Sequence, residues 1–347
     1  GVDSVTVHAG LAGACGGITG VGTIFPKASI TMQEHVLKGE WAEANKISQA
    51  LNSISYLDAQ PLLLEYLKFA MGIHHNLSWQ LGDITLHRII EDQSALMPIR
   101  DFLPNLSEEV LAQNRDVLFK AGAIDKLDQI ILCFQSYVVK TPHHTILVDS
   151  CLGNHKNRPN RPRWHNKTDS TYMTALAQAG IAVEEIDFVM CTHLHVDHVG
   201  WNTRLENGVW VPTFPKARYL FSQKEYAYWE ERSKTEQIDH ILDSVLPIIA
   251  LGKGDLITSS DAVTDHVRLL PTPGHTIDHF AVTLGAKHDD GVIIGDLFHS
   301  PIQITHPELF MRLDYDAAQS TQSRISFLER YVDTPTLCCT SHFPSPS

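Results

Sequence analysis

The chain has 347 residues, of which 43% are hydrophobic and 19% are charged, and its formal net charge is −13. This length allows one large core, or one core with a small appendage, and no apolar run approaches the roughly 18–20 residues of a membrane span. The acidic balance without a basic stripe excludes non-specific nucleic-acid binding, so we expect neither nucleic acid nor a membrane as a partner.

The cysteines indicate the redox compartment. There are 6, spaced without a disulfide rhythm, and Cys338 and Cys339 are adjacent in an apolar stretch. This usage is typical of small core residues in a reducing compartment and predicts a cytoplasmic protein. The chain begins at Gly1 rather than at methionine, so its native start is not visible and no targeting signal can be read.

Residues 1–73 differ in character from the rest. A glycine-rich stretch covers 13–21, Phe25-Pro26-Lys27 follows, and helical patterns cover 29–50 and 61–71. This segment resembles the C-terminal part of an aldolase barrel of the dihydrodipicolinate synthase or N-acetylneuraminate lyase type. The strands for that family's Schiff-base lysine and tyrosine are absent, and a barrel cannot close from one or two strands. The resemblance implies a non-catalytic, mostly helical appendage that packs on the second domain or on another copy, as in a homodimer. The alternative is a fusion remnant with partial order.

Residues 74–77 form a polar junction, and a second domain is expected over 78–347. Its first strand patterns cover 84–90, 129–139 and 145–148, with a helical region before Ala121. Ser170 is the expected cap of a helix that ends at Gly180, and helices follow at 223–232, 237–249 and 317–331.

The most informative motif is Thr-His-Leu-His-Val-Asp-His-Val-Gly at 192–200, directly after the apolar run 186–191. Imidazole and carboxylate suit zinc and its neighbours, and alternate residues of an extended segment point the same way. His193 and His195 can therefore hold one ion, while Asp197 and His198 can turn towards a second. The alternative, a histidine-rich surface loop, requires neither the alternation nor the preceding strand.

Three later strand patterns each end at a potential ligand. The run 267–270 precedes His275, 291–294 precedes Asp296, and 336–340 precedes His342. In this order after the HxHxDH motif, these residues resemble the metallo-β-lactamase superfamily over about 76–347.

The resemblance implies an α/β fold, the four-layer αβ/βα sandwich, which the alternation of strands and helices also favours. It implies two divalent metal ions, with zinc as the best match and manganese, iron or cobalt as alternatives. By the same resemblance, Asp296 would bridge the two ions. The first ion would be held by His193, His195 and His275, and the second by Asp197, His198 and His342.

The candidate catalytic residues are Asp197, Asp149 and His299. Asp149 is similar to an acidic residue that many superfamily members place near the metals, where it orients a ligand or a water; the alternative is an Asx turn. A bridging water is the expected nucleophile, because zinc lowers the pKa of bound water from about 15.7 to about 7.

Aromatic residues near the motif are the expected substrate pocket. They would come from the segment after the motif and from the segment after Asp296, and they predict a small apolar or neutral substrate. A plain core role is the alternative for each of them. The five residues are Trp201, Trp210, Phe214, Phe298 and Phe310.

Within the superfamily, Asp296 argues against true β-lactamases, and His195 argues against the diiron flavoproteins. The absence of a basic cluster near the C-terminus argues against glyoxalase II. The remaining pattern resembles N-acyl homoserine lactonases and methyl parathion hydrolase-like enzymes. Lactonases place a tyrosine three residues after the bridging aspartate, where this chain has His299. Its imidazole would then be the proton donor, and simple packing is the alternative.

The sequence therefore predicts a binuclear metal-dependent hydrolase in which a bridging hydroxide attacks an ester or lactone carbonyl. One alternative is a phosphotriester hydrolase of the methyl parathion type. The other is a weakly active metal-binding remnant of a fusion, because only five residues follow His342 and a final strand would be missing.

Overall fold

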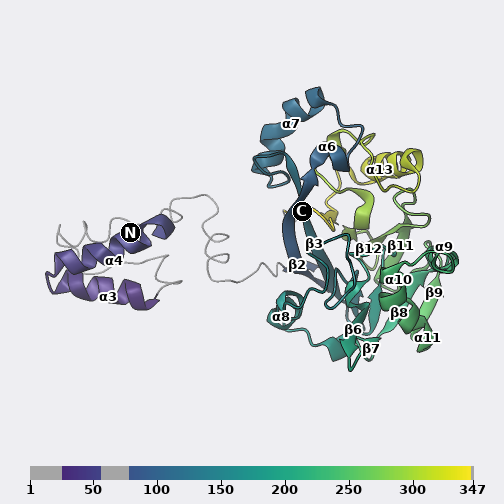
Figure 1. Ribbon diagram of the computed structural model, residues 1–347, viewed down its shortest axis with the longest axis horizontal. Coiled ribbons are helices and arrows are strands. Elements are labelled where there is room, and N and C mark those ends of the chain that lie inside the picture. The colour runs from purple at the N-terminus through teal and green to yellow at the C-terminus, as the bar shows by residue number, and fades with distance from the viewer. Residues whose placement is uncertain (1–25, 56–77, 345–347) are drawn as a thin grey trace. The chain divides into compact units, whose positions relative to one another are not determined.

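The computed structural model describes residues 26–55 and 78–344, and the chain divides into two units, Gly1–His75 and Asn76–Ser347. In the first unit, α3 (Pro26–Leu37) and α4 (Trp41–Ser55) lie side by side in every view (Figure 1). Met32 and Val36 pack against Ala44 and Ile47.

The helical pattern predicted over 29–50 is thus two helices rather than one. Gly39 has φ +76, a left-handed conformation that ends helices and that glycine adopts without steric cost. The other features of the aldolase resemblance, 13–21 and 61–71, lie outside the described residues.

Seven strands of the described part of the second unit form one sheet, in the order β1-β2-β3-β4-β5-β8-β9. The strands β4, β5, β8 and β9 pair in parallel, so their carboxyl ends meet at one edge. The bounds are β1 (Ser78–Leu81), β2 (Ile84–Pro98), β3 (Gln129–Lys140), β4 (Thr145–Val148), β5 (Phe188–Met190), β8 (Arg218–Ser222) and β9 (Gly254–Ile257).

The second sheet has five strands within the described ranges, in the order β10-β11-β12-β13-β14. Only β13 and β14 pair in parallel, so the segments that follow them emerge side by side. The bounds are β10 (Ala262–Thr264), β11 (Val267–Pro271), β12 (Phe280–Leu284), β13 (Gly291–Ile293) and β14 (Leu337–Cys339).

A separate hairpin, β6 (Thr203–Glu206) and β7 (Val209–Pro212), follows the histidine motif. Its second strand carries Trp210, one of the aromatic residues expected in the substrate pocket. Asn207 and Gly208 have positive φ, as two-residue hairpin turns require, and allow the two strands to pair.

Helices cover the outer faces of the two sheets. Their bounds are α6 (Ile99–Phe102), α7 (Glu108–Lys120), α8 (Thr171–Gln178), α9 (Gln223–Ser233), α10 (Asp239–Ser244), α11 (Leu246–Ala250), α12 (Ile302–Thr305) and α13 (Ala317–Tyr331). The helix predicted over 237–249 is split at Val245, because Pro247 lacks the N–H that a continuous helix needs. Ser170 lies at the start of α8, but Asp169 accepts the N–H of Thr171 there instead.

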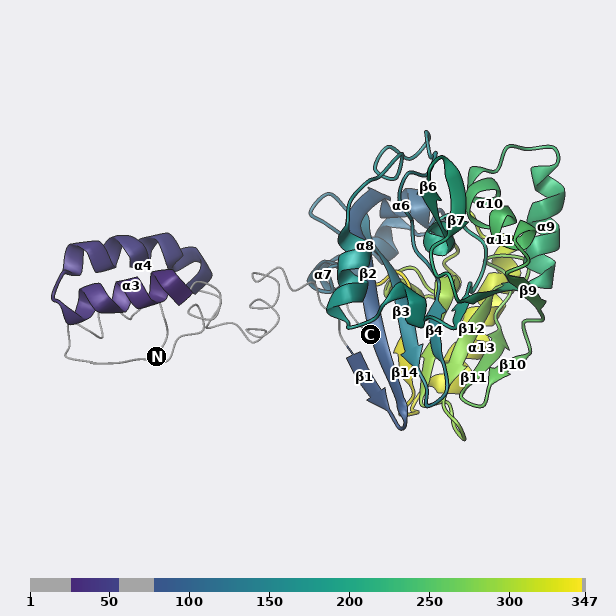
Figure 2. The same ribbon diagram turned by 90° about the horizontal axis from the view of Figure 1, so that it is seen from below.

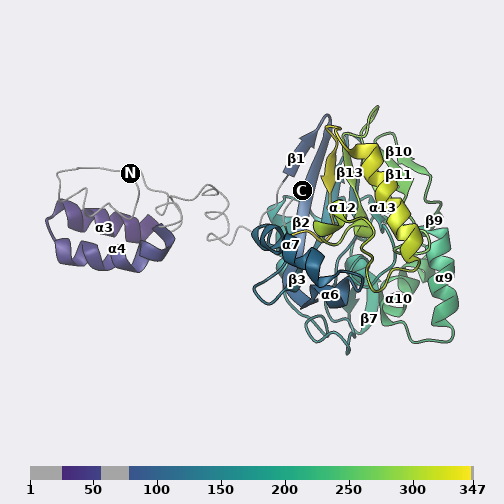
Figure 3. The same ribbon diagram turned by 90° about the horizontal axis from the view of Figure 1, so that it is seen from above.

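Strand alternation separates the core into layers. Ile146 and Val148 of β4 face the second sheet with Phe280 and Val282, whereas Leu147 between them faces Tyr172 of α8. On the far side, Phe327 of α13 packs against the second sheet. Figure 2 shows α8 beside β2, and Figure 3 shows α13 across the second sheet. These layers confirm the predicted four-layer αβ/βα sandwich.

Within the described ranges, no helix combines the length and the apolarity needed to cross a bilayer. The five cysteines of these ranges are free thiols, and burial raises their pKa values, as expected for core residues. Cys15 lies outside these ranges.

Candidate metal centre

The topology brings the candidate ligands together. The histidine motif follows the carboxyl end of β5, and Asp296 and His342 follow the parallel strands β13 and β14. His275 lies in the turn between β11 and β12. Three overlapping groups result, and in each the ligand-type atoms lie within 4.8 Å of one another. They are His193-His195-His275-Asp296, Asp197-His198-His342 and Asp296-His299-His342.

Asp296 lies at the centre, and its two oxygens face different histidines. Oδ1 is 3.0 Å from Nε2 of His198 and 3.0 Å from Nε2 of His342. Oδ2 is 3.2 Å from Nε2 of His275 and 3.6 Å from Nε2 of His193. The carboxylate therefore divides the imidazoles into two sets, one for each oxygen.

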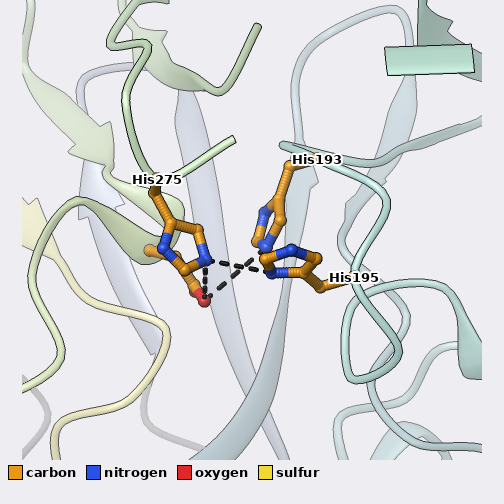
Figure 4. A group of neighbouring side chains, drawn as sticks. His193, His195 and His275 are labelled. Carbon is orange, nitrogen blue, oxygen red and sulfur yellow. Dashed lines mark hydrogen bonds and ion pairs between the residues drawn. The ribbon is translucent and has the colours of Figure 1, made fainter. Parts of the chain in front are cut away.

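The imidazoles of His193, His195 and His275 point toward one another (Figure 4). Nε2 of His275 lies 3.0 Å from Nδ1 of His195. Its other nitrogen, Nδ1, lies 2.8 Å from Oδ1 of Asp314. Asp314 thus fixes the ring of His275, as second carboxylates commonly do for metal-binding histidines. The sequence gives no signal for Asp314, which lies in an irregular segment before α13.

Asp149 organises the histidine motif. One of its oxygens accepts the backbone N–H of Thr192 at 2.8 Å, and the other lies 2.9 Å from Nδ1 of His198. This leaves Nε2 of His198 directed towards Asp296. Asp149 itself has φ +59, so its backbone is held in a sparsely populated conformation. Asp149 therefore contacts both ends of the histidine motif, and its orienting role stays a prediction.

His279 is a further buried residue of the centre that the sequence reading missed. Its Nε2 accepts the backbone N–H of Asp296 at 2.9 Å, and its Nδ1 lies 3.2 Å from the carbonyl of Thr272. A Cβ at Gly295 would lie 2.5 Å from Nε2 of His279, so glycine is required beside this contact. His279 therefore holds the backbone of Asp296 in place, and its position four residues after His275 is the one signal that could have found it.

Several buried polar atoms of the centre are without hydrogen-bond partners among the described residues. They include Nε2 of His193, Nε2 of His198 and Oδ1 of Asp296. Burial holds the pKa of His193 and His195 well below the usual value, so these rings are neutral and keep a lone pair for a cation. Nε2 of His198 and Oδ1 of Asp296 lie 3.0 Å apart but make no hydrogen bond, and a divalent cation would satisfy both atoms. The donor set therefore fits metal ions.

His299 lies beside the centre, with Nε2 3.1 Å from Oδ2 of Asp296 and its ring stacked on His342. Burial lowers its pKa from the ordinary value near 6.5 to about 4, with Asp296 only partly opposing this shift. At neutral pH the ring is uncharged and offers one N–H. Its Nδ1 makes no hydrogen bond within the described part of the chain.

The structure corrects the predicted substrate pocket, because its five aromatic residues do not line the cavity beside the metal centre. Trp201 is buried in the core, where its ring stacks on Tyr172 and its Nε1 donates to Glu91 at 2.9 Å. Phe214 is buried in the same core, and Phe298 packs against Phe327.

The other two predicted aromatics also lie away from the cavity. Trp210 lies in β7 under Nζ of Lys156, 3.7 Å from its ring centroid. Phe310 is half-buried in the segment before α13, where its N–H donates to Asn105.

A cavity of about 890 Å³ does open onto the centre, next to Asp197, Asp296 and His299. Other aromatic residues line it: Phe102, Phe134, Trp164, Tyr228, Trp229 and Tyr315. They come from α6, β3, α9 and two loops, so no single stretch of sequence carries the pocket. Leu96, Met97 and Met311 extend its apolar wall.

Arg88 holds the chain that follows His342. Its buried guanidinium donates to the carbonyls of Phe343 and Pro344, each at 3.3 Å, and to Oε1 of Gln135. His342 is fixed further by the carbonyl of Cys133, 2.9 Å from its Nδ1.

We expect Arg88→Met to lower the free energy of unfolding by about 1–3 kcal/mol, because the substitution leaves buried acceptors unpaired. Urea denaturation of the metal-free protein measures this. The matched control is Arg330→Met, which removes an exposed ion pair with Asp289 and should cost less than about 1 kcal/mol. Equal unfolding midpoints for the two variants would contradict the role of Arg88.

Comparison with known proteins identifies the family of the second unit. The family model described as the metallo-beta-lactamase superfamily matches residues 135–342. No curated protein matches the chain. The comparisons give no support to the aldolase-barrel resemblance predicted for residues 1–73, because the solved structures cover about three quarters of the chain and belong to the hydrolase fold.

Three solved structures illustrate the similarity of fold. The hydrolase AbOPH of the beta-lactamase superfamily is 22% identical, with a TM-score of 0.63 over 78% of this chain and 90% of its own. AidC, a dizinc quorum-quenching lactonase in complex with a product, N-hexanoyl-L-homoserine, is 22% identical, with a TM-score of 0.64 over 78% and 91%. A probable metal-dependent hydrolase from Staphylococcus aureus is 18% identical, with a TM-score of 0.63 over 76% and 91%. Because the family model spans more than half of the sequence, the chain belongs to the metallo-β-lactamase superfamily.

Proposed function

We propose that this protein is a binuclear metal-dependent hydrolase that acts on esters or lactones. The observation that supports this most directly is the division of contacts at Asp296, whose Oδ1 faces His198 and His342 while Oδ2 faces His193 and His275. A carboxylate that lies between two sets of imidazoles is well placed to be a ligand that two cations share.

The residues that would hold the metal ions are the seven that the sequence predicts. One ion would take His193, His195 and His275, the other would take Asp197, His198 and His342, and Asp296 would serve both. Divalent ions in such a centre supply Lewis acidity and lower the pKa of a bound water from about 15.7 to about 7.

The chain's own residues supply orientation and binding. Asp149, Asp314 and His279 fix His198, His275 and the backbone of Asp296. The largely apolar walls of the cavity bind the organic part of the substrate and exclude bulk water. His299 presents one N–H beside Asp296, where a leaving oxygen would gain negative charge.

The relatives agree with this chemistry at the level of fold. AidC is named a dizinc lactonase, and another neighbour, 16% identical with a TM-score of 0.52, is an N-acyl homoserine lactone hydrolase with its product bound at the catalytic metal centre. The opening of a lactone and the hydrolysis of an ester break the same acyl–oxygen bond. One centre therefore accommodates both reactions.

Protein purified without chelator is expected to hold about two divalent ions per chain, because seven ligand residues surround a shared carboxylate. Elemental analysis by plasma mass spectrometry measures this. A reproducible value of one or less after zinc or manganese supplementation would contradict the binuclear centre.

A substrate panel on the metal-reconstituted protein tests the reaction. We expect hydrolysis of acyl lactones and aryl esters, with the activity lost on chelation and restored by the metal. Faster hydrolysis of an aryl phosphotriester than of any ester would overturn the ester assignment. A fully loaded protein without activity on any of the three classes would indicate the metal-binding remnant.

A further inference from the structure

Arg161 is an unusual cation in the wall of the cavity. Its side chain makes no hydrogen bond and no ion pair with any residue described by the structure, and its guanidinium lies over the ring of Trp164, 4.7 Å from the centroid. Burial is the main effect on its pKa and lowers it, and Asp197 only partly offsets this. Arg161 is partly buried, and a partly buried guanidinium without an anion beside it is costly unless a ligand supplies that anion.

Neighbouring arginines of the cavity have anionic partners. Arg158 is bound by both oxygens of Asp243, at 2.7 and 3.0 Å. Arg232 pairs with Glu236 at 2.5 Å, and Arg312 lies 3.8 Å from Asp101. Arg161 is the exception, although the charge of Asp197, a candidate ligand of the metal centre, acts on it. Arg161 and the metal centre therefore face the same cavity.

The loop that carries Arg161 holds its backbone in place. The N–H of Arg161 donates to the carbonyl of Arg158, and its own carbonyl accepts from Trp164 and His165. Pro159 and Pro162 flank it and restrict the backbone further. A cation on a constrained loop binds a ligand with less loss of conformational freedom than one on a mobile loop.

Two more polar atoms of the same wall are unpaired. Nε of Arg158 and Nε2 of His240 are buried and make no hydrogen bond within the described ranges. Burial, together with the charge of Arg158, lowers the pKa of His240 to about 3, so the ring is neutral. These atoms and the guanidinium of Arg161 form a polar patch in a wall that is otherwise largely apolar. The patch indicates a polar group of the ligand.

We propose that the substrate of this hydrolase carries a carboxylate, and that Arg161 binds it. The planar guanidinium matches a carboxylate with two parallel N–H bonds, which a neutral group cannot reproduce at the same strength. This inference rests on the proposed ester or lactone hydrolysis, and it replaces the neutral substrate that the sequence predicts. The ester or lactone lies at the metal centre, and the carboxylate lies on the part of the substrate that extends along the cavity.

A matched pair of substrates tests the proposal. The 4-nitrophenyl monoester of glutaric acid and its ω-carboxamide have the same leaving group and nearly the same shape, and they differ in one charge. We expect kcat/KM to be about 10- to 100-fold higher for the acid, the size of a charge-assisted hydrogen bond. Arg161→Gln should abolish this preference by lowering the rate on the acid alone. Arg161→Lys should keep part of it.

Arg330→Gln is the matched control, because it removes an exposed arginine charge that pairs with Asp289 and does not line the cavity. It should leave both rates and their ratio unchanged. Equal kcat/KM for the two esters in the native protein would overturn the proposal, as would an equal loss on both esters in Arg161→Gln.

Binding of glutarate separates this inference from the hydrolase function. By calorimetry on the metal-loaded protein, glutarate should bind at least about 10-fold more weakly to Arg161→Gln than to the native protein or to Arg330→Gln. A carboxylate held only at the metal centre would bind all three equally and would overturn the inference. If neither ester is hydrolysed but glutarate binding depends on Arg161, the proposed reaction fails and the carboxylate site stands.

Discussion

Replacing Asp296 with alanine is expected to release at least one metal ion and to lower kcat by several orders of magnitude. Its two oxygens lie 3.0 Å from Nε2 of His198 and of His342 and 3.2 Å from Nε2 of His275, so its loss separates both sets of imidazoles from their common anion. Two cations without a shared carboxylate repel each other more strongly. Elemental analysis and kcat on an aryl ester measure the two effects.

The control for this prediction is Asp149→Ala. Asp149 contacts His198 through Nδ1, the nitrogen on the opposite side of the ring from the one that faces Asp296. Its loss should misorient the ring without removing a ligand, at a cost of about 10- to 100-fold in activity or metal affinity. Equal losses in the two variants would show that the central position of Asp296 carries no special role.

The candidate ligands could be predicted from the sequence because their signal is local. Each follows a short apolar strand or lies in the turn after one, and the carboxyl ends of parallel strands meet at the same edge of a sheet. His193 and His198 are five residues apart, so the single segment that follows β5 carries both of them. The layers of the fold could be predicted for the same reason, since the alternation of Ile146, Leu147 and Val148 already separates two faces.

The substrate pocket could not be predicted, because it depends on contacts between distant segments. Trp201 directly follows the metal motif, yet Glu91, 110 residues earlier, fixes its indole in the core. Lys167 pairs with Glu91 at 2.7 Å and completes this buried contact. The aromatic residues that do line the cavity precede the motif, lie on α9 or, in the case of Tyr315, lie just before α13, so no local spacing in the sequence marks them as one group.

The sequence also did not reveal two residues whose importance depends on their neighbours in the folded chain. Asp314 lies 39 residues after His275 and in no recognisable motif, so only the folded chain shows that their side chains meet. Arg161 is one of several arginines in a polar loop. What distinguishes it is the absence of an anion beside it within the described residues, and a sequence does not record which charges are paired.

Replacing His299 with alanine is expected to lower kcat for lactones and alkyl esters by about 10²- to 10³-fold, the cost of removing one donor that stabilises a developing oxyanion. Burial keeps the ring neutral at pH 7, so its contribution is an N–H hydrogen bond to the leaving alkoxide. A 4-nitrophenolate carries its charge without help, so the 4-nitrophenyl ester of the same acid should lose much less.

Metal content is the control for this prediction, because Nε2 of His299 lies 3.1 Å from Oδ2 of Asp296 and the residue belongs to a group that could hold an ion. The variant should keep the native metal content. If its metal content falls, His299 is a ligand, and the loss of activity follows from the missing ion. If the metal stays and both leaving groups lose equally, His299 acts on the attacked carbonyl and not on the leaving oxygen.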